Sequence, residues 1–294
     1  MMEVSIIIIN YNTEDLLRKC IASIISKTEN LLYEIIVVDN HSENSPHKML
    51  VENFPDVFFV SSKENLGFGK ANNLGASYAT GKYLFLLNSD TILINNAIKV
   101  LFDYKEKDVK KEIGACGGNL FTEDMKPNFS FSMYYPSLYS IVAYRLHLSF
   151  LLNNEIFNSI GIPKEVSIII GADLFIEREL FNNLNGFDPA FFMYVEDGEL
   201  QLRIKKKGLK MMSVPEAKII HLQGASSSTF FKMKTEFDSY FYYFKKQFNR
   251  KSQSRYKNIE LFSNSLKLFY FILTNNKAKK KDYLDILKYI YAKQ

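Results

Sequence analysis

The feature that most constrains the fold is the regular spacing of short, continuous apolar runs in the first third of the chain. Such runs are typical of strands covered on both faces of a sheet. Helical periodicity appears between them, in Glu14 to Lys27, which Thr13 could cap, and again in Asn65 to Ala79. The runs are Val4 to Ile9, Glu34 to Asp39, Val57 to Ser61 and Tyr83 to Asn88. This alternation predicts an α/β fold with a doubly wound, mostly parallel central sheet.

Polar residues follow each of the predicted strands. A single polar strand end is an ordinary turn, but the carboxyl ends of parallel strands meet at one edge of a sheet, where ligands bind. The polar segments are Asn10 to Asn12, Asp39 with Asn40, Asn65 to Asn72, and Asn88 to Asp90. Their convergence predicts a binding site at that edge.

The glycine-rich stretch NLGFGKANNLG, Asn65 to Gly75, is not a P-loop, because no Gly-Lys-Ser/Thr follows four spaced residues. It is also a poor dinucleotide fingerprint, since Asn72 replaces the third glycine and the stretch follows the third predicted strand. Glycines at a helix start can nevertheless bring backbone N–H groups close to an anion. An anion-binding loop and a simple glycine-rich turn both remain open.

Three further residues could carry chemistry. Asp90, at a strand end, is a plausible ligand for Mg²⁺ or Mn²⁺, which prefer oxygen and share their shell with phosphates. Glu196 and Asp197 stand in an acidic turn at a predicted helix start, where they either stabilise the helix dipole or act as a general base with a positioning partner. His221 ends another predicted strand. It could be a structural residue there, or it could be a ligand.

The second half of the chain has a less regular pattern. It predicts a strand at Ser167 to Gly171, a helix at Glu177 to Leu184, and a helix at Glu199 to Lys207 that Gly208 closes. Short strands follow at Met211 to Val214 and Lys218 to His221, and helices with a basic amphipathic tail follow Phe230. Aromatic residues make up 15% of the chain, all of them Phe or Tyr.

Composition narrows the class of protein. Cys20 and Cys116 fit no metal-binding spacing, and the first residues lack the cationic start of a signal peptide, which together favour a reducing cytoplasm. We expect no transmembrane helix, because the segment nearest to one, Met133 to Leu152, is interrupted by Arg145 and His147. The net charge of +5 is modest for a nucleic-acid-binding protein, and the sequence has no helix-turn-helix or RNA-binding motif. We therefore expect no nucleic-acid partner.

Taken in order, these motifs resemble glycosyltransferase family 2, most closely its bacterial rhamnosyltransferase-like branch. The resemblance covers roughly residues 3 to 228. The motifs are IIIINYN, VVDN, NLGFGKANN, LLNSD, the block from GADLFIER to GFDPAFFMYVEDGELQLR, and His221. The resemblance implies a GT-A (glycosyltransferase A) catalytic domain at 1–229. It would comprise a Rossmann-like nucleotide-sugar-binding half at 1–100 and an acceptor-binding half at 101–229, followed by a C-terminal helical region at 230–294.

The resemblance also implies roles for individual residues. Asp197 matches the catalytic base, with Glu196 beside it, and Asp90 and His221 match residues that reach a divalent metal, Mg²⁺ or Mn²⁺. The implied acceptor-binding residues are Gly171, Ala172 and Glu196. The implied donor-binding residues are Asn10, Tyr11, Asp39, Asn65, Gly67, Phe68, Asn72, Asn88, Ser89 and Asp90.

Two positions depart from the family pattern. Asn88 stands where the first carboxylate of the DxD metal motif would be, which puts metal affinity in question. Glu199 replaces an aspartate that is usual after the Glu-Asp pair, a conservative change.

The implied reaction is an inverting sugar transfer from a nucleotide-diphosphate sugar, such as a UDP- or dTDP-sugar, in cell-surface polysaccharide synthesis. It needs one base and an electrostatic clamp for the leaving diphosphate, and no carboxylate nucleophile. A nucleotidyltransferase would want a basic glycine-rich loop where this chain has Asn10-Tyr11-Asn12. The alternative that is not an enzyme is a non-catalytic nucleotide-sugar or glycan-binding subunit with the same fold.

Two aromatic-rich segments have no role in this scheme. Met133 to Leu152 and Phe262 to Tyr291 could meet a lipid-linked glycan acceptor as a peripheral contact at the inner face of the membrane, with basic side chains around the apolar parts. The alternative is that they pack against the catalytic domain or against a second subunit in a homodimer.

Overall fold

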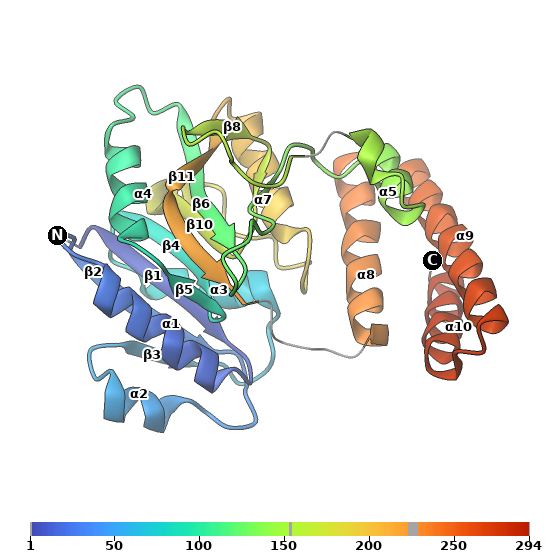
Figure 1. Cartoon of the computed structure of the whole chain (residues 1–294), viewed down its shortest axis with the longest axis horizontal. Helices are drawn as coiled ribbons and strands as arrows, with labels where there is room; N and C mark the ends of the chain where they lie inside the picture. The colour runs from blue at the N-terminus through green and yellow to red at the C-terminus, as the bar shows by residue number, and fades with distance from the viewer. Residues whose placement is uncertain (1, 153–154, 223–228, 294) are drawn as a thin grey trace. The chain divides into compact units, whose positions relative to one another are not determined.

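The computed structural model describes residues 2–152, 155–222 and 229–293 (Figure 1). The chain forms two compact units. The first comprises Met1–Tyr135, Glu155–Pro189 and Asp197–Ala225, and the second comprises Pro136–Asn154, Ala190–Glu196 and Ser226–Gln294. The second unit therefore includes two segments that precede the expected boundary near residue 229. The division of the first part into a nucleotide-sugar half and an acceptor half stays a prediction.

The first unit is built on a mixed central sheet in the strand order β3-β2-β1-β4-β10-β6-β11-β5, with β8 paired to β11. Strands β3, β2, β1 and β4 run parallel, as do β6 and β11, whereas β10 runs antiparallel between β4 and β6. The strands are β1 Val4–Asn10, β2 Tyr33–Asp39, β3 Phe58–Ser61, β4 Tyr83–Asn88, β5 Thr91–Leu93, β6 Ile113–Phe121, β8 Lys164–Val166, β10 Asp173–Glu177 and β11 Lys210–His221. The predicted α/β fold with a mostly parallel sheet is confirmed.

Helices cover both faces of this sheet, because successive residues of a strand point to opposite faces. Ile6 and Ile8 of β1 belong to the core beneath α1, α2 and α4, and Ile7 belongs to the core beneath α3, α6 and α7. Gly75 of α3 lies so close to β1 that an added Cβ would be 2.5 Å from Ile7 Cγ2. The helices are α1 Glu14–Lys27, α2 His47–Asn53, α3 Phe68–Tyr78, α4 Ala97–Glu106, α6 Arg178–Asn183 and α7 Glu196–Lys206.

Strand register brings the polar strand ends to one edge of the sheet. Asn10, the last residue of β1, pairs with Asp39 of β2, and its neighbour Ile9 pairs with Asn88 of β4. Asp39 in turn pairs with Ser61 of β3. The prediction that these ends converge is confirmed.

The prediction of a strand at 167–171 was wrong in its extent. Only Ile168–Ile169 forms a strand, β9, which pairs with β7, Phe131–Ser132, outside the central sheet. The strand that enters the central sheet is β10, which begins two residues after Gly171. Apolar residues continue on both sides of this glycine, so the sequence pattern alone did not separate the two strands.

Other local predictions also need correction. The two short strands expected at 211–214 and 218–221 are one strand, β11, with a register shift between Ser213 and Lys218. Thr13 precedes α1, but its side chain does not cap the helix, because its hydroxyl donates to Asn10 Oδ1 at 2.9 Å. The helix expected from Asn65 begins at Phe68.

The second unit is helical. Its helices α8, α9 and α10 pack side by side, and α5 packs against α9 (Figure 1). Their core is aromatic, with the Tyr256 ring stacked on Phe237 and Phe244 at centroid distances of 5.6 and 5.1 Å. Many of the aromatic residues noted in the sequence therefore lie in this core. The elements are α5 Leu138–Arg145, the 3-10 turn η1 Ser149–Leu152, α8 Thr229–Gln247, α9 Arg250–Leu273 and α10 Lys277–Ala292.

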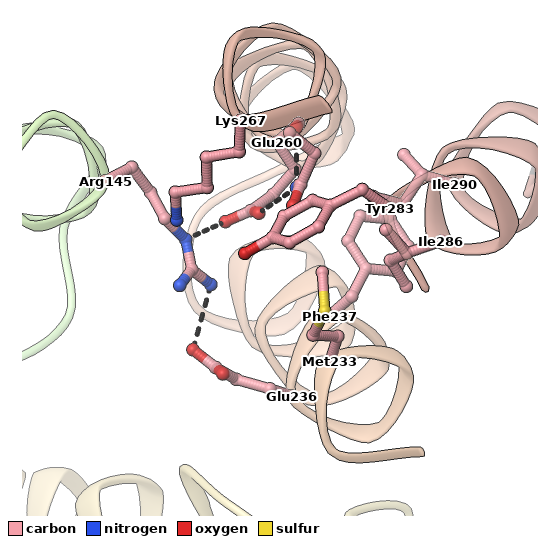
Figure 2. Close-up of a pocket in the computed structure, with 10 residues that line it drawn as sticks. Arg145, Met233, Glu236, Phe237, Glu260, Lys267, Tyr283, Ile286 and Ile290 are labelled. Atoms are coloured by element: carbon pink, nitrogen blue, oxygen red, sulfur yellow. Dashed lines mark hydrogen bonds and ion pairs between the residues drawn. The ribbon is translucent and has the colours of Figure 1, made fainter. Parts of the chain in front are cut away.

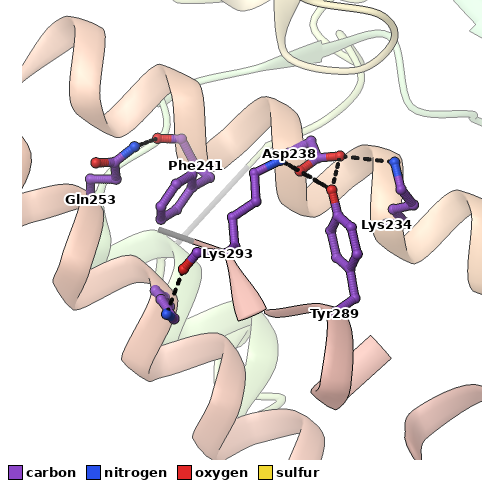
Figure 3. Close-up of polar contacts among 7 residues, drawn as sticks. Lys234, Asp238, Phe241, Gln253, Tyr289 and Lys293 are labelled. Atoms are coloured by element: carbon purple, nitrogen blue, oxygen red, sulfur yellow. Dashed lines mark hydrogen bonds and ion pairs between the residues drawn. The ribbon is translucent and has the colours of Figure 1, made fainter. Parts of the chain in front are cut away.

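Two polar clusters join these helices. Asp238 of α8 accepts hydrogen bonds from the Tyr289 hydroxyl at 2.7 Å and from Lys293 Nζ at 2.5 Å, and Lys234 pairs with it at 3.2 Å (Figure 3). This cluster fixes the end of α10 on α8. Arg145 of α5 forms the second cluster with carboxylates of α8 and α9. No helix in the described part of the chain has the length and apolar character needed to cross a bilayer.

Candidate active site

The first corner of the site joins the ends of β1 and β2. Asn10 Nδ2 donates to Asp39 Oδ1 and to Ser42 Oγ, both at 3.0 Å, and the Ser42 hydroxyl donates to Asp39 Oδ1 at 2.6 Å. Asn10 and Asp39 are almost fully buried, whereas the Tyr11 side chain is 46% exposed. Two donors on one carboxylate oxygen hold Asp39 in place, and the residue after Asn10 carries an aromatic ring that solvent can reach.

The glycine-rich stretch is shaped by Asn40, which follows Asp39. Asn40 Oδ1 accepts from the backbone N–H of Leu66 at 2.8 Å, and its Nδ2 donates to Asn65 Oδ1 at 3.0 Å. Gly67 has a φ of 78°, which a side chain would disfavour, and the helix α3 starts immediately after it. Asn72 Nδ2 donates to the Phe68 carbonyl at 3.1 Å. The loop before α3 is therefore preformed by side-chain amides.

The end of β4 meets the end of β11. His221 Nε2 lies 3.3 Å from Asp90 Oδ1, and Asn88 Nδ2 lies 3.4 Å from the same nitrogen. Asp90 and His221 have similar side-chain exposures of 15% and 13%. The other ring nitrogen, Nδ1, is buried without a hydrogen-bond partner among residues 2–152, 155–222 and 229–293. Two residues 131 positions apart are thus adjacent at one strand edge.

The Asp90 and His221 pair suits a divalent cation. Neighbouring ligands of an octahedral ion with bonds of about 2.1 Å are roughly 3.0 Å apart, close to the observed separation. Carboxylate oxygen is a common ligand of Mg²⁺ and Mn²⁺, and imidazole nitrogen is a common ligand of first-row transition-metal ions. Within the described residues no group of three His, Cys, Asp or Glu could enclose a metal ion. A cation held here would need further ligands from a bound substrate.

Asp197, at the start of α7, lies at the other end of the site. Its Oδ2 accepts the backbone N–H of Gly171 at 3.0 Å, and its Oδ1 accepts the N–H of Gly198 at 2.7 Å. Burial raises the pKa of this carboxyl, and the two N–H donors oppose that effect only in part. The arrangement is a held carboxylate that takes up a proton more readily than a free aspartate, as a general base requires.

The chain reaches Asp197 through strained backbone. Tyr194 and Val195 have φ values of 71° and 70°, and a β-branched residue rarely adopts this conformation. The first turn of α7 is then anchored by Gln201, whose amide exchanges two hydrogen bonds of 2.7 Å with the backbone of Ile169. The restricted backbone before Asp197 and the hydrogen bonds of Gln201 after it together fix the direction of the Asp197 carboxylate.

Glu196 and Glu199, the other acidic residues of this turn, differ from Asp197. Glu196 is buried and belongs to the second compact unit. Glu199 is fully buried and pairs with Arg203 at 2.9 Å, and Arg203 donates to the carbonyls of Leu184 and Gly186. Through Arg203, Glu199 therefore holds the segment at Leu184 and Gly186 in place, which is a structural role.

A continuous series of contacts links Asp197 to the Asp90 and His221 pair. Gly171, which donates to Asp197, is followed by Ala172, whose carbonyl accepts the N–H of Asn88 at 3.0 Å. Asn88 then contacts His221. Phe68 closes this side, because a Cβ added to Gly171 would lie 3.3 Å from its ring. Of the expected site residues, the structure joins Phe68, Asn88, Asp90, Gly171, Ala172, Asp197 and His221 in this series.

The remaining expected residues form the donor-side corner. Ser89 connects the two parts, because its hydroxyl lies 3.0 Å from that of Thr13, which donates to Asn10. Residues that the sequence analysis did not assign to the site also support it, namely Ser42, Asn128 and Gln201. Asn40, which the sequence analysis placed among the polar strand ends without a role of its own, shapes the glycine-rich loop. Ser42 could have been found from its position just after a strand end, whereas no sequence signal marked Gln201 or Asn128.

Comparison with known proteins agrees with this geometry. The profile of glycosyl transferase family 2 matches residues 5–161, and that of the N-terminal domain of galactosyltransferase matches residues 154–224. The first match alone spans more than half of the chain. The chain belongs to glycosyltransferase family 2, and the resemblance inferred from its motifs is confirmed.

Individual relatives point to the same enzyme class. The chain is 28% identical to rhamnosyltransferase WbbL of Escherichia coli over 78% of this chain and 86% of that protein. It is 24% identical to the N-acetylglucosaminyl-diphospho-decaprenol L-rhamnosyltransferase of Mycobacterium tuberculosis, over 76% of each. The crystal structure of GalNAc-T7 with UDP, GalNAc and Mn2+ has the same fold, with a TM-score of 0.59 at 20% identity. That match covers 80% of this chain and 47% of the other. The chain is a glycosyltransferase with the GT-A fold.

Proposed function

We propose that this enzyme moves a sugar, with inversion, from a nucleotide-diphosphate sugar to a glycan or lipid-linked glycan acceptor in cell-surface polysaccharide synthesis. The observation that carries the proposal is the series of contacts from Asp197 through Gly171, Ala172 and Asn88 to His221 and Asp90. It connects one candidate base with one candidate cation site. Those are the two elements that an inverting transfer requires.

Asp197 acts as the base in this proposal. The acceptor hydroxyl loses its proton to the carboxylate as its oxygen forms the new bond to the sugar, and the bond from the sugar to the diphosphate breaks. Because burial raises the pKa of Asp197, it accepts the proton better than an exposed aspartate would. The acceptor would lie along Gly171 and Ala172, with Glu196 preceding the base.

Asp90 and His221 would hold a divalent cation, Mg²⁺ or Mn²⁺. When bound, such a cation neutralises charge on the leaving diphosphate. With two candidate protein ligands, the diphosphate oxygens would complete the shell, so donor and metal should bind together. Asn88, which departs from the family pattern, contributes an amide contact to His221.

The corner of Asn10, Tyr11 and Asp39 would receive the nucleotide base. Asp39 is held by two hydrogen bonds and can accept one more from a base N–H, and the exposed ring of Tyr11 can stack on the base. Both features suit a base with an N–H group, such as uracil or thymine, and UDP in the structure of GalNAc-T7, which has the same fold, supports a UDP- or dTDP-sugar as the donor. The loop at Asn65, Gly67, Phe68 and Asn72 would line the same pocket.

The deciding experiment supplies donor and acceptor and measures release of free nucleoside diphosphate together with product. In Asp197→Asn we expect turnover to fall at least about 100-fold, the usual contribution of a general base, while nucleotide binding is retained. Asp103→Asn, on an exposed part of α4, is the matched control and should keep full turnover. Unchanged turnover in Asp197→Asn would remove its role as base. Nucleotide binding without any turnover in the wild type would favour the non-catalytic subunit.

A further inference from the structure

The C-terminal half of α9 buries polar residues and exposes large apolar ones, although Phe271 packs inward on the Tyr283 ring at a centroid distance of 5.3 Å. The residues that it buries against the rest of the second unit are polar, namely Glu260, Ser263 and Asn264, each at most 5% exposed. On the other face stand Phe262, Leu266, Phe269 and Leu273. A helix of a monomeric globular unit normally buries its apolar stripe. The large apolar residues left exposed on this helix indicate that their face meets something apolar.

The exposed residues form a regular stripe. Phe262, Leu266, Phe269 and Leu273 are spaced by four, three and four residues, which places them on one side of a helix. They are 60, 48, 62 and 69% exposed. We call these four residues the α9 stripe. Tyr270 and Ile272 flank it and are also about half exposed. Contiguous exposed aromatic and aliphatic groups of this kind mark an interaction surface.

Basic residues flank the α9 stripe in the sequence. Between Arg250 and Lys281 the chain has nine lysines and arginines and a single acidic residue, Glu260. That glutamate is buried and pairs with Arg145 at 2.7 Å, so it offers no negative charge to a partner. Lys279, Lys280 and Lys281 follow the stripe at the start of α10 and are exposed. The surface is therefore apolar at its centre and basic at its end.

We propose that the α9 stripe and the adjoining lysines of α10 bind the surface of an anionic lipid bilayer. Apolar side chains would enter the boundary between headgroups and acyl chains, and the lysines would pair with anionic headgroups. Long lysine side chains can reach the headgroups while their stems cover apolar surface. The proposal concerns the second unit and does not depend on the transfer reaction.

Charge argues against a second copy of the chain as the occupant. In a two-fold dimer the same patch meets itself, so the basic clusters of both copies would lie near one another. In the first turns of α10 four lysines, Lys277 and Lys279 to Lys281, outnumber two aspartates, Asp282 and Asp285, so each copy would bring a net positive charge. Like charges at an interface are unfavourable, whereas an anionic membrane neutralises them. The neighbouring helix α5 is compatible with a membrane contact, since Tyr139 is 65% exposed and Phe150, just beyond α5, is 75% exposed.

The test is sedimentation of the full chain with lipid vesicles. One set is phosphatidylcholine alone, and the other contains equal parts of phosphatidylcholine and phosphatidylglycerol. We expect binding to the anionic vesicles, little binding to the neutral ones, and weaker binding as salt is raised. In Phe269→Gln/Leu273→Gln we expect the partition coefficient to fall at least about tenfold, because two large apolar side chains no longer enter the bilayer. Glutamine keeps helix propensity close to that of leucine, so α9 should remain folded.

Matched controls distinguish vesicle binding through the α9 stripe from nonspecific binding by other exposed apolar residues. Leu32→Gln/Phe58→Gln removes apolar groups of similar exposure, 61 and 49%, from the first unit and should bind vesicles as the wild type does. Lys279→Glu/Lys280→Glu/Lys281→Glu should also bind at least about tenfold more weakly, with a smaller salt dependence. Nucleotide binding should be equal in all variants, so a failure of the proposed function would appear there and not in the vesicle assay.

Three outcomes would overturn the proposal. The first is equal sedimentation of the wild type and Phe269→Gln/Leu273→Gln. The second is equal binding to neutral and anionic vesicles. The third is a wild type that stays in solution with both vesicle types and is dimeric by light scattering, while the stripe variant is monomeric. That last result would assign the face to a second copy of the chain.

Discussion

The carboxylate of Asp197 accepts the backbone N–H of Gly171 at 3.0 Å, although the two residues are separated by 26 positions. This hydrogen bond joins the start of α7 to the segment that leads into β10. It matters because Ala172, the next residue, is bonded through its carbonyl to the N–H of Asn88 at the end of β4. The candidate base and the candidate cation ligands are therefore held by one framework of backbone contacts.

The raised pKa of Asp197 predicts the acid side of the pH profile. Since transfer needs the ionised carboxylate, kcat/KM should rise with pH as Asp197 loses its proton, with a midpoint above the value of about 3.9 for a free aspartate. Asp197→Glu keeps a carboxylate that is less well held by Gly171, so we expect residual activity with a shifted midpoint. Steady-state rates across the acid range measure this. A wild-type profile that is flat from about pH 4 to about pH 8 would contradict the assignment.

Asp90 gives a second prediction, on metal dependence. In Asp90→Ala, affinity for the nucleoside diphosphate in the presence of Mn²⁺ should fall at least about tenfold, because one of two candidate protein ligands is lost. Chelation with EDTA should weaken binding to the wild type and have little effect on the variant. Calorimetry with UDP, dTDP and GDP measures both effects and identifies the base. Asp103→Ala is the control, and equal metal dependence in Asp90→Ala would count against the site.

Much of this architecture could be predicted from the sequence, for identifiable reasons. The runs that end at Asn10, Asp39 and Asn88 are continuous and apolar, which is the pattern of parallel strands buried on both faces. Because parallel strands in register end together, the polar residues after them had to meet at one edge. The resemblance then implied roles for residues such as Asp90 and Asp197, and those roles stay predictions until they are measured.

Other features had no local signal. The hydrogen bonds of Gln201 to Ile169 join residues 32 apart, and nothing in the apolar spacing marks that glutamine as different from the exposed polar residues at the end of the same helix, Lys205 and Lys206. The positive φ of Val195 is imposed by its surroundings against the preference of a β-branched residue. The β10 strand was missed because antiparallel insertion into a parallel sheet depends on partners far away in the chain.

A third prediction concerns Asp173, which is fully buried in β10. Its Oδ2 accepts the N–H of Gly118 at 2.6 Å, and burial raises the pKa of its carboxyl well above the usual value. The folded state therefore binds a proton that the unfolded state releases at about pH 3.9, so the free energy of unfolding falls as pH rises from there toward the folded pKa. Asp173→Asn carries no charge and should lose this slope. Urea unfolding at about pH 5 and about pH 8 measures it, and an equal slope in both proteins would refute the account.

The last prediction concerns Arg145, which lies between two carboxylates of the second unit beside a cavity of about 70 Å³ (Figure 2). Its Nε donates to Glu260 at 2.7 Å and its guanidinium pairs with Glu236 at 2.9 Å. Glu260 is only 3% exposed, so Arg145→Met would leave a buried carboxylate without its cation. We expect a loss of about 3 to 5 kcal/mol in the free energy of unfolding.

Two further variants test the cause of that loss. Arg145→Met/Glu260→Gln removes both charges and should recover part of the stability, because the main cost is the uncompensated carboxylate and not the missing side chain. Lys267→Met, on the same cavity, is the control. Burial and the nearby Arg145 lower the pKa of Lys267, so its charge is disfavoured there and its removal should cost little. If the double variant were as unstable as Arg145→Met alone in urea unfolding, packing by Arg145 would be the main contribution of this residue and the ion pair a minor one.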